Sequence, residues 1–208
     1  IIIEGVKKLN GINEIVPSDR IEAGTFAIAV SATGGRIKLE NTNYDENKTL
    51  FKILEKTGSK INKSKNSINI EKTNDEIYPV NIKTSPYPGF PTDLQAQIMT
   101  LMAISNGKSE IKENIFENRF MHVQELVRMG ANIKLDKDKA LIKGIKNLNG
   151  ANVMATDLRA SASLIIAGLA AIGKTTISRI YHLDRGFYNL ESKLNNCGAS
   201  IKRIKDNG

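Results

Sequence analysis

The chain has 208 residues, of which 40% are hydrophobic and 25% are charged, and its formal net charge is +8. These values are ordinary for a globular protein of one or two domains, and the single cysteine excludes an intrachain disulfide and favours a reducing compartment such as the cytoplasm. The sequence shows no signal peptide and no transmembrane run. The positive charge suits nucleic acid or phosphorylated small molecules, although scattered lysines and the lack of Trp argue against base stacking.

The first 17 residues predict two short strands, because residues 1–6 and 14–17 are rich in Ile and Val. Residues 7–13 form the turn between them. The chain begins with a strand and no preceding turn, which indicates a fragment of a longer protein.

From residue 18 onward the chain repeats one pattern three times, with a period of roughly 65–75 residues. Each copy opens at a Ser/Thr-Asp step, which contains Asp19, Asp93 or Asp157, and continues into an apolar run. Each copy later contains an amphipathic helix that is followed by a glycine and a strand. We interpret the pattern as three β-α-β-α-β-β units.

The predicted elements are as follows, in chain order. The first unit has helices at 18–32 and 47–56 and strands at 36–39, 60–62 and 67–71. The second has strands at 79–84, 109–113 and near 133, and helices at 92–107 and near 126–129. The third has helices at 156–172 and 190–197, and strands at 174–180 and near 201.

The first helix of the third unit is apolar on almost all sides, which predicts a buried helix. Thr156 or Asp157 is the expected N-cap, and Gly173 is the expected left-handed residue just after its end. With fewer than twenty apolar residues, interrupted by Gly168, the segment is a poor membrane span.

The loop at residues 85–93 contains three prolines and a glycine and leads directly into a helix. Such a loop is stiff, since each proline restricts the backbone. A plain connection would not need this stiffness, so we expect the loop to orient Asp93.

The three helix starts converge at one end of the domain if the units are related by pseudo-threefold symmetry. Helix N-termini attract anions, and arginines add bidentate donors for phosphate or carboxylate. Arg119 and Arg185 lie in the loops after strands, and Arg159 lies in the first turn of the third unit's first helix. Asp93 and Asp157 would then act as a base or a ligand anchor in this positive field.

These residues also have purely structural interpretations. A lone Asp at a helix start is often only an N-cap, and a lone loop Arg is often a surface residue. We expect His122 and His182 to be hydrogen-bonded packing residues and Cys197 to be a small buried hydrophobe. The sequence contains no metal-ligand spacing, P-loop or dinucleotide fingerprint.

Four stretches resemble motifs of the UDP-N-acetylglucosamine enolpyruvyl transferases (1-carboxyvinyltransferases). They are residues 91–97 (Pro-Thr-Asp-Leu-Gln-Ala-Gln), 116–122 (Phe-Glu-Asn-Arg-Phe-Met-His), 155–161 (Ala-Thr-Asp-Leu-Arg-Ala-Ser) and 180–186 (Ile-Tyr-His-Leu-Asp-Arg-Gly). The resemblance covers essentially the whole chain. The related shikimate-pathway transferases share the fold but would not be expected to carry the motif at residues 117–122.

The resemblance implies an inside-out α/β barrel of three β-α-β-α-β-β repeats with buried helices, which is one of the two barrels of such an enzyme. Residues 18–208 would form this barrel, with repeats at about 18–78, 79–145 and 146–208. Residues 1–17 would be trailing strands of the other barrel and the crossover. The chain then looks like a carboxyl-terminal half that lacks the family's Lys-Asn motif and the loop with its catalytic Cys or Asp. Cys197 does not match that position, so the chain alone is expected to be inactive.

By the same resemblance, the enzyme transfers the enolpyruvyl group of phosphoenolpyruvate to the 3-hydroxyl of UDP-N-acetylglucosamine in the first committed step of peptidoglycan synthesis. Such a step serves cell-wall biogenesis, cell shape and cell division in the bacterial cytoplasm.

The resemblance also assigns roles to individual residues. Asp93 would contact the hydroxyl as the candidate base, and Ile115 would contact the nucleotide sugar. Arg119 and Arg185 would hold the phosphoenolpyruvate carboxylate and phosphate, and Asp157 with Arg159 would support the intermediate and the closed state.

The implied partners are the two substrates and the missing amino-terminal half, with no nucleic acid, membrane, metal or organic cofactor. Two alternatives remain open. One is a non-enzymatic basic module that binds RNA, and the other is a regulatory or split half that needs a partner chain.

Overall fold

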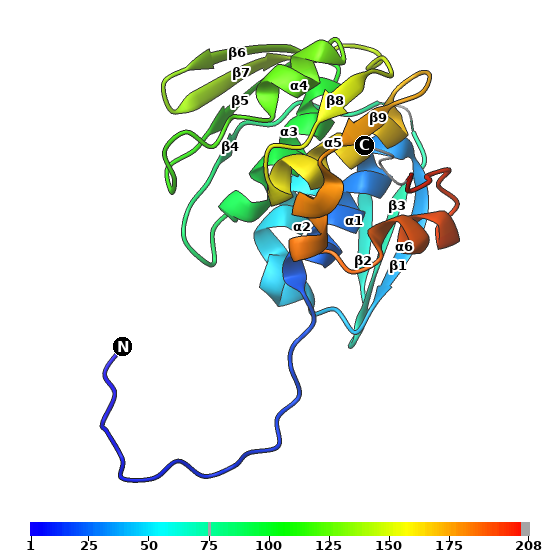
Figure 1. Ribbon diagram of the computed structural model, residues 1–208. Coiled ribbons are helices and arrows are strands. Elements are labelled where there is room, and N and C mark those ends of the chain that lie inside the picture. The colour runs from blue at the N-terminus through cyan, green and yellow to red at the C-terminus, as the bar shows by residue number, and fades with distance from the viewer. Residues whose placement is uncertain (75, 205–208) are drawn as a thin grey trace.

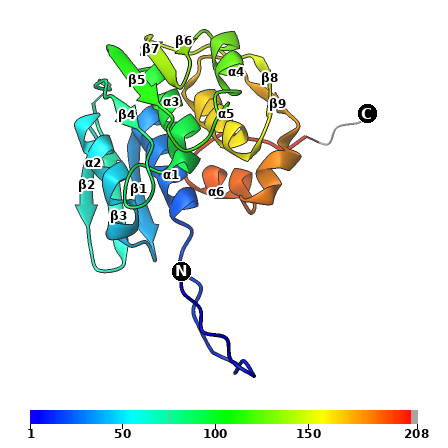
Figure 2. The same cartoon turned by 90° about the vertical axis from the view of Figure 1, so that its left-hand side faces the viewer.

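The computed structural model describes residues 1–74 and 76–204. Three separate β-sheets lie around a group of central helices, and each sheet comes from one of three consecutive units of the chain (Figure 1 and Figure 2).

The first unit contains two α-helices and an antiparallel sheet. Its elements are α1 (Arg20–Thr33), β1 (Gly35–Glu40), the 3-10 helix η1 (Tyr44–Asn47), α2 (Lys48–Lys56), β2 (Lys60–Lys63) and β3 (Ser67–Lys72). The strand order is β1-β3-β2, and Ile37 and Ile61 both pair with Ile70. The helices and strands predicted between residues 18 and 72 are confirmed, with small shifts at their ends.

The strands predicted at residues 1–6 and 14–17 are wrong. All of residues 1–17 are exposed, they contain no strand, and their trace runs away from the folded body (Figure 1). A strand needs a partner for its N–H and C=O groups, and the described part of the chain provides none here. A composition rich in Ile and Val therefore does not form a strand by itself.

The second unit has the full β-α-β-α-β-β order. Its elements are β4 (Ile82–Lys83), the 3-10 helix η2 (Thr92–Leu94), α3 (Gln95–Ala103), β5 (Lys108–Lys112), α4 (Val123–Arg128), β6 (Asn132–Asp136) and β7 (Lys139–Lys143). The sheet order is β4-β5-β7-β6, where β4 and β5 are parallel and the other pairs are antiparallel.

The third unit is shorter. It contains β8 (Asn152–Met154), α5 (Leu158–Ala170), β9 (Thr176–Ser178), the 3-10 helix η3 (Ile180–Arg185) and α6 (Leu190–Asn196), and β8 and β9 form a parallel pair. The strand predicted near residue 201 is absent, because residues 199–204 form no strand.

Cys197 is exposed, so the prediction of a small buried hydrophobe at this position is wrong. The equivalent residues of the other units, Thr57 and Met129, are buried. The chain that follows covers them, since the Thr57 carbonyl accepts the N–H of Tyr78 and the Met129 carbonyl accepts the N–H of Asn149. No described segment follows α6 to cover Cys197 in the same way.

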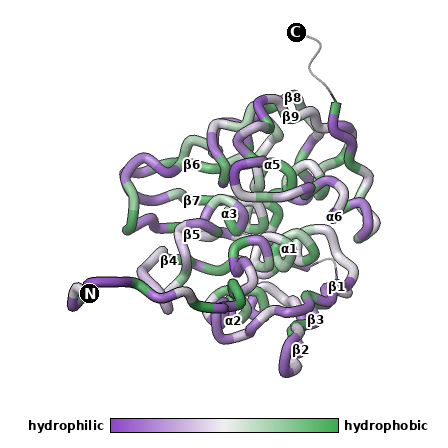
Figure 3. Tube along the Cα trace, turned by 60° about the horizontal axis from the view of Figure 1, so that its bottom comes forward, coloured by the Kyte–Doolittle hydropathy of each residue, from purple (hydrophilic) through white to green (hydrophobic). Residues whose placement is uncertain are grey.

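The central helices α1, α3 and α5 pack against one another, and each also packs against its own sheet. Every residue of α3 is buried, as are residues 23–31 of α1 and 160–167 of α5, which confirms the predicted buried helices. Figure 3 shows hydrophobic residues along α1 and α5 in the middle of the molecule. Gly24 permits this close packing, because a Cβ there would lie 2.5 Å from Leu94 Cδ1. Among the described helices, none is both long and apolar enough to span a membrane.

The three Ser/Thr-Asp steps do not behave alike. Asp19 Oδ1 accepts the N–H groups of Ile21 and Glu22 at the start of α1, and Asp157 caps α5 in the same way. Asp93 lies inside η2 instead, and no side chain caps η2 or α3. Helix α5 ends at Ala170, so Gly173 is not its terminating residue, although its φ of 93° is left-handed.

Candidate active site

The proline-rich loop before η2 folds back on itself. The Ser85 N–H donates to the Phe90 carbonyl at 3.0 Å, and the Gly89 N–H donates to the Pro86 carbonyl at 2.8 Å. The Phe90 ring is only 2% exposed and anchors the end of the loop in the core. A Cβ at residue 89 would collide with the Ser85 side chain, so this turn requires glycine. These contacts support the expectation that the loop orients Asp93.

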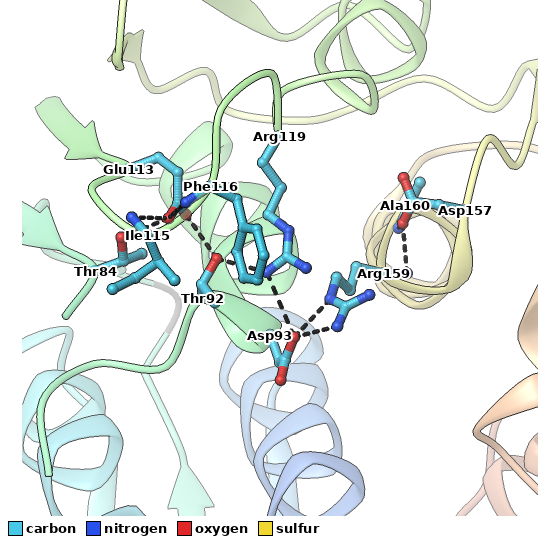
Figure 4. Close-up of polar contacts among 10 residues, drawn as sticks. All are labelled: Thr84, Thr92, Asp93, Glu113, Ile115, Phe116, Arg119, Asp157, Arg159 and Ala160. Atoms are coloured by element: carbon cyan, nitrogen blue, oxygen red, sulfur yellow. Dashed lines mark hydrogen bonds and ion pairs between the residues drawn. The ribbon is translucent and has the colours of Figure 1, made fainter. Parts of the chain in front are cut away.

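Asp93 is the meeting point of two arginines from distant parts of the chain (Figure 4). Its Oδ1 atom accepts a hydrogen bond of 2.6 Å from Arg159 Nε and also pairs with Arg159 Nη2. Arg119 Nη1 lies 3.5 Å from the same oxygen. The other oxygen, Oδ2, points away from both guanidinium groups and receives no hydrogen bond from the described residues. The carboxylate is thus anchored at one oxygen and open at the other.

Arg119 is held on several sides. Its Nη1 donates a 2.7 Å hydrogen bond to Thr92 Oγ1, and its guanidinium carbon lies 4.1 Å from the centroid of the Phe116 ring. Burial and the positive charge of Arg159 lower the pKa of Arg119, whereas Asp93 opposes the shift. A guanidinium still stays protonated at neutral pH. An anion bound between the two arginines would relieve their mutual repulsion.

Asp157 and Arg159 are both placed by the first turn of α5. Asp157 Oδ1 accepts the N–H groups of Arg159 and Ala160 at 2.8 and 3.0 Å, so this carboxylate satisfies the helix end. The side chain of Arg159 leaves the same turn and reaches Asp93 (Figure 4). Asp157 therefore helps to orient Arg159 through the helix cap, while its own side chain does not contact Asp93 or Arg119.

Arg185 lies at the end of η3 and is exposed, and its side chain makes no hydrogen bond or ion pair with any described residue. Gly186 packs closely against Leu158, so η3 ends beside the start of α5. The structure thus places Arg185 near the start of α5, but no described contact joins its side chain to Asp93.

Ile115 is half-buried in the loop after β5, and its N–H donates to Glu113 Oε1 at 2.9 Å. Of the six residues singled out from the sequence, side-chain contacts join Asp93, Arg119 and Arg159, and Asp157 reaches this group only through the backbone N–H of Arg159.

Sequence reasoning missed Glu113 and Thr92. Glu113 is only 3% exposed and accepts hydrogen bonds from two threonine hydroxyls, those of Thr84 and Thr92, each at 2.8 Å (Figure 4). The sequence contained a signal for Glu113, because alternation along the strand puts Ser109, Ile111 and Glu113 on the same face. The structure shows that this face points inward, since Ser109 and Ile111 are buried. A carboxylate at an inward position must have partners, which marks it as a residue of interest.

His122 and His182 differ in burial. His122 is only 2% exposed, and its Nε2 atom has no hydrogen-bond partner among the described residues, so it packs in the core without the expected bond at that atom. Burial lowers the pKa of His122 to about 4, although the negative charge of Asp157 opposes the shift. His182 stacks at a tilt on Tyr181, with ring centroids 4.3 Å apart. No group of three or more His, Cys, Asp or Glu side chains in the described part of the chain is arranged to hold a metal ion.

Inner helices that pack on outer sheets form the described core, and this arrangement matches that of solved enolpyruvyl transferases. The chain belongs to the EPSP synthase (3-phosphoshikimate 1-carboxyvinyltransferase) family, whose sequence profile matches residues 1–194. This confirms the α/β, enolpyruvyl transferase-like fold class expected from the sequence, although only the second unit has the complete β-α-β-α-β-β order. The enolpyruvyl transferase NikO from Streptomyces tendae superimposes with a TM-score of 0.77 at 26% identity, over 88% of this chain and 43% of that one. An EPSP synthase from Acinetobacter baumannii has the same fold, with a TM-score of 0.71 at 18% identity, over 90% of this chain and 48% of that one.

Relatives with higher identity carry the name UDP-N-acetylglucosamine 1-carboxyvinyltransferase. The one from Bartonella henselae is 58% identical over 204 residues, which cover 97% of this chain and 47% of the relative. The one from Rhizobium johnstonii is 55% identical over 206 residues, which cover 99% of this chain and 48% of the relative. The chain thus spans about half the length of the curated relatives that it matches.

Proposed function

We propose that the chain is the carboxyl-terminal half of a UDP-N-acetylglucosamine 1-carboxyvinyltransferase, which transfers the enolpyruvyl group of phosphoenolpyruvate to the 3-hydroxyl of the nucleotide sugar. The observation that carries the proposal is the cluster of Asp93, Arg119 and Arg159, because it combines an open carboxylate oxygen with two anion-binding guanidiniums. The identity to relatives of that name, up to 58%, supports the choice of substrates.

Asp93 is the proposed base of the reaction. The two arginines hold Oδ1, so Oδ2 is the oxygen that can accept the proton of the sugar hydroxyl. The hydroxyl oxygen bonds to the enol carbon of phosphoenolpyruvate while a proton, from solvent or from a group of the other half, adds to the methylene carbon, so the double bond is lost and a tetrahedral intermediate forms. The methylene carbon then gives up a proton and the double bond forms again as the carbon–oxygen bond to phosphate breaks, and inorganic phosphate leaves.

The arginines are the proposed anion-binding groups. Arg119 and Arg185 would hold the carboxylate and phosphate of phosphoenolpyruvate, and Arg159 would stabilise the negative charge of the intermediate. Arg185 is exposed and unpartnered among the described residues, so an anion would be its first charged partner. Asp157 supports Arg159 through the helix cap, and Ile115 contacts the nucleotide sugar.

Further parts of the proposal concern the rest of the enzyme. Residues 18–208 form one barrel, residues 1–17 lead from a second barrel, and a half with the remaining catalytic groups completes the active site. The place of action is peptidoglycan synthesis in the bacterial cytoplasm, and the proposed steps use no metal or organic cofactor.

The test is phosphate release from phosphoenolpyruvate and UDP-N-acetylglucosamine. We expect none from the 208-residue chain alone and turnover once the amino-terminal half of a relative is added as a second chain. The matched control is the same mixture with Asp93→Asn. Robust release by the chain alone would contradict the need for a second half. Binding of RNA with a steep salt dependence, without binding of the nucleotide sugar, would favour a basic binding module instead.

A further inference from the structure

Glu113 is a buried carboxylate for which the proposed reaction has no use. It follows directly after β5 and is 3% exposed, and it forms no salt bridge with an arginine or lysine in the described part of the chain, although its negative charge acts on Arg119 at longer range. Hydroxyl and amide donors satisfy it instead. Burying a carboxylate without hydrogen-bond donors costs free energy. A set of donors around Glu113 therefore indicates that this residue has a role in the site.

The two oxygens of Glu113 serve different parts of the site. Oε1 accepts the Thr84 hydroxyl at 2.8 Å and the N–H groups of Ile115 and Phe116 at 2.9 and 3.2 Å. These bonds fold the loop that leads to Arg119. Among the described residues, Oε2 accepts a hydrogen bond only from the Thr92 hydroxyl, at 2.8 Å.

The proton direction along this chain of hydrogen bonds is set by its two ends. A carboxylate only accepts hydrogen bonds and a guanidinium only donates them. The Thr92 hydroxyl between them therefore donates to Glu113 and turns a lone pair towards Arg119, whose Nη1 lies 2.7 Å away (Figure 4). Without the carboxylate, the hydroxyl would lose the acceptor for its hydrogen and would keep only the contact with Arg119.

Thr92 is a suitable bridge because it precedes Asp93 in η2. One short helix thus presents a hydroxyl and a carboxylate to the same nitrogen, Nη1 of Arg119, at 2.7 and 3.5 Å. The shorter bond is the one to Thr92. The Glu113–Thr92 pair therefore provides the nearest polar contact that orients Arg119, beside the ion pair with Asp93 and the Phe116 ring.

We propose that Glu113 is a positioning residue that acts through the Thr92 hydroxyl to hold Arg119 in the orientation that binds the anionic co-substrate. Glu113 touches neither substrate in this scheme. Only the identity of the anion, phosphoenolpyruvate, rests on the proposed function, because the orientation of Arg119 exists without a ligand.

The first test uses the 208-residue chain without substrates and measures ¹⁵N relaxation of the arginine Nε–H signals, which reports side-chain order on the picosecond–nanosecond timescale. Arg119 is assigned from the signal that disappears in Arg119→Lys. We expect a rigid Arg119 signal in the wild type and a mobile one in Thr92→Val, with exposed Arg185 as the internal mobile reference. Thr92→Ser should restore the rigid signal because it keeps the hydroxyl.

Thr92→Val is the decisive variant, because it leaves the three hydrogen bonds to Glu113 Oε1 in place. Glu113→Gln should also release Arg119, and Glu110→Gln is its matched control on β5. Glu110 pairs with Lys139 at 3.0 Å outside the site, so its variant should keep the wild-type signal. A rigid Arg119 in Thr92→Val would overturn the proposal.

The second test measures steady-state kinetics in the enzyme completed with the second half. Thr92→Val should raise the KM for phosphoenolpyruvate about tenfold, the effect of one hydrogen bond to a charged group, with a much smaller change in the KM for the nucleotide sugar. Equal effects on both substrates would overturn the proposal. The two proposals can fail separately. If Arg119 becomes mobile in Thr92→Val as expected, but neither the wild type nor any variant binds phosphoenolpyruvate, the positioning role of Glu113 stands and the proposed function fails.

Discussion

The second and third units contain the same Thr-Asp step at a helix start but use the aspartate differently. Asp157 has an extended backbone, with φ −160° and ψ 178°, so its side chain folds back onto the N–H groups of the first turn of α5. Asp93 lies inside the 3-10 helix η2, where its side chain points outward to Arg119 and Arg159. The loop before the step, rather than the step itself, decides between cap and site residue.

The arginines of the second and third units also differ in how many contacts they make. Arg119 is 18% exposed and rests on Thr92 and Phe116, whereas Arg185 is exposed and has no partner among the described residues. The second unit has a four-stranded sheet and the third has a two-stranded one. The described residues of the second unit thus hold the Arg119 side chain in place, whereas those of the third unit leave the Arg185 side chain without a partner.

The largest expected effect comes from Asp93→Asn in the completed enzyme. Turnover should fall by about 10²–10⁴-fold, the usual range for loss of a general base, while the melting temperature stays near the wild-type value because Asp93 caps no helix. The measurement combines phosphate release, nucleotide-sugar affinity and thermal unfolding on one variant. A near-normal rate would end the base assignment.

Replacement of the two arginines comes next. Arg119→Ala and Arg185→Ala should each lower turnover by about 10²–10³-fold, the range for loss of one electrostatic donor. Thermal unfolding of the chain should show no change for Arg185→Ala, since that side chain has no described partner. Arg119→Ala removes existing contacts, so a small loss of stability is allowed there, but a collapse that explains the lost turnover would contradict its role.

The buried His122 should make the stability of the chain depend on pH. Its pKa is about 4 in the folded state and 6.5 in the reference state, so the unfolded chain takes up a proton first as the pH falls. Stability is fully present above pH 6.5 and is lost towards pH 4, by about 3 kcal/mol at most. Urea unfolding at several pH values should show this slope in the wild type and in His182→Gln. A slope that persists unchanged in His122→Gln would argue against burial of a neutral imidazole.

The smallest effect concerns the helix cap. Asp157→Ala should destabilise the chain by about 1 kcal/mol, because two N–H groups at the start of α5 lose their acceptor. Asp93→Ala removes no cap and should have a smaller effect on thermal unfolding. Equal losses of stability in Asp157→Ala and Asp93→Ala would contradict the difference proposed between the two aspartates.

The sequence by itself determined most of the local elements between residues 18 and 196. The apolar runs, the helix starts at the three Ser/Thr-Asp steps and the three similar units were readable, because capping and hydrophobic periodicity involve residues close in the chain. The resemblance of four motifs also led to the family, which the match to residues 1–194 confirms.

Only the tertiary structure decided what the charged and apolar side chains meet. Asp93 and Arg159 are 66 residues apart, and Glu113 reaches Thr92 across 21, so no local pattern could pair them. Two of the wrong predictions have the same cause. Cys197 is exposed because no described segment covers it, and residues 1–17 form no strand because no described strand pairs with them, and local composition supplies neither. Burial and long-range hydrogen bonds are properties of neighbours in space, and folding alone brings those neighbours together.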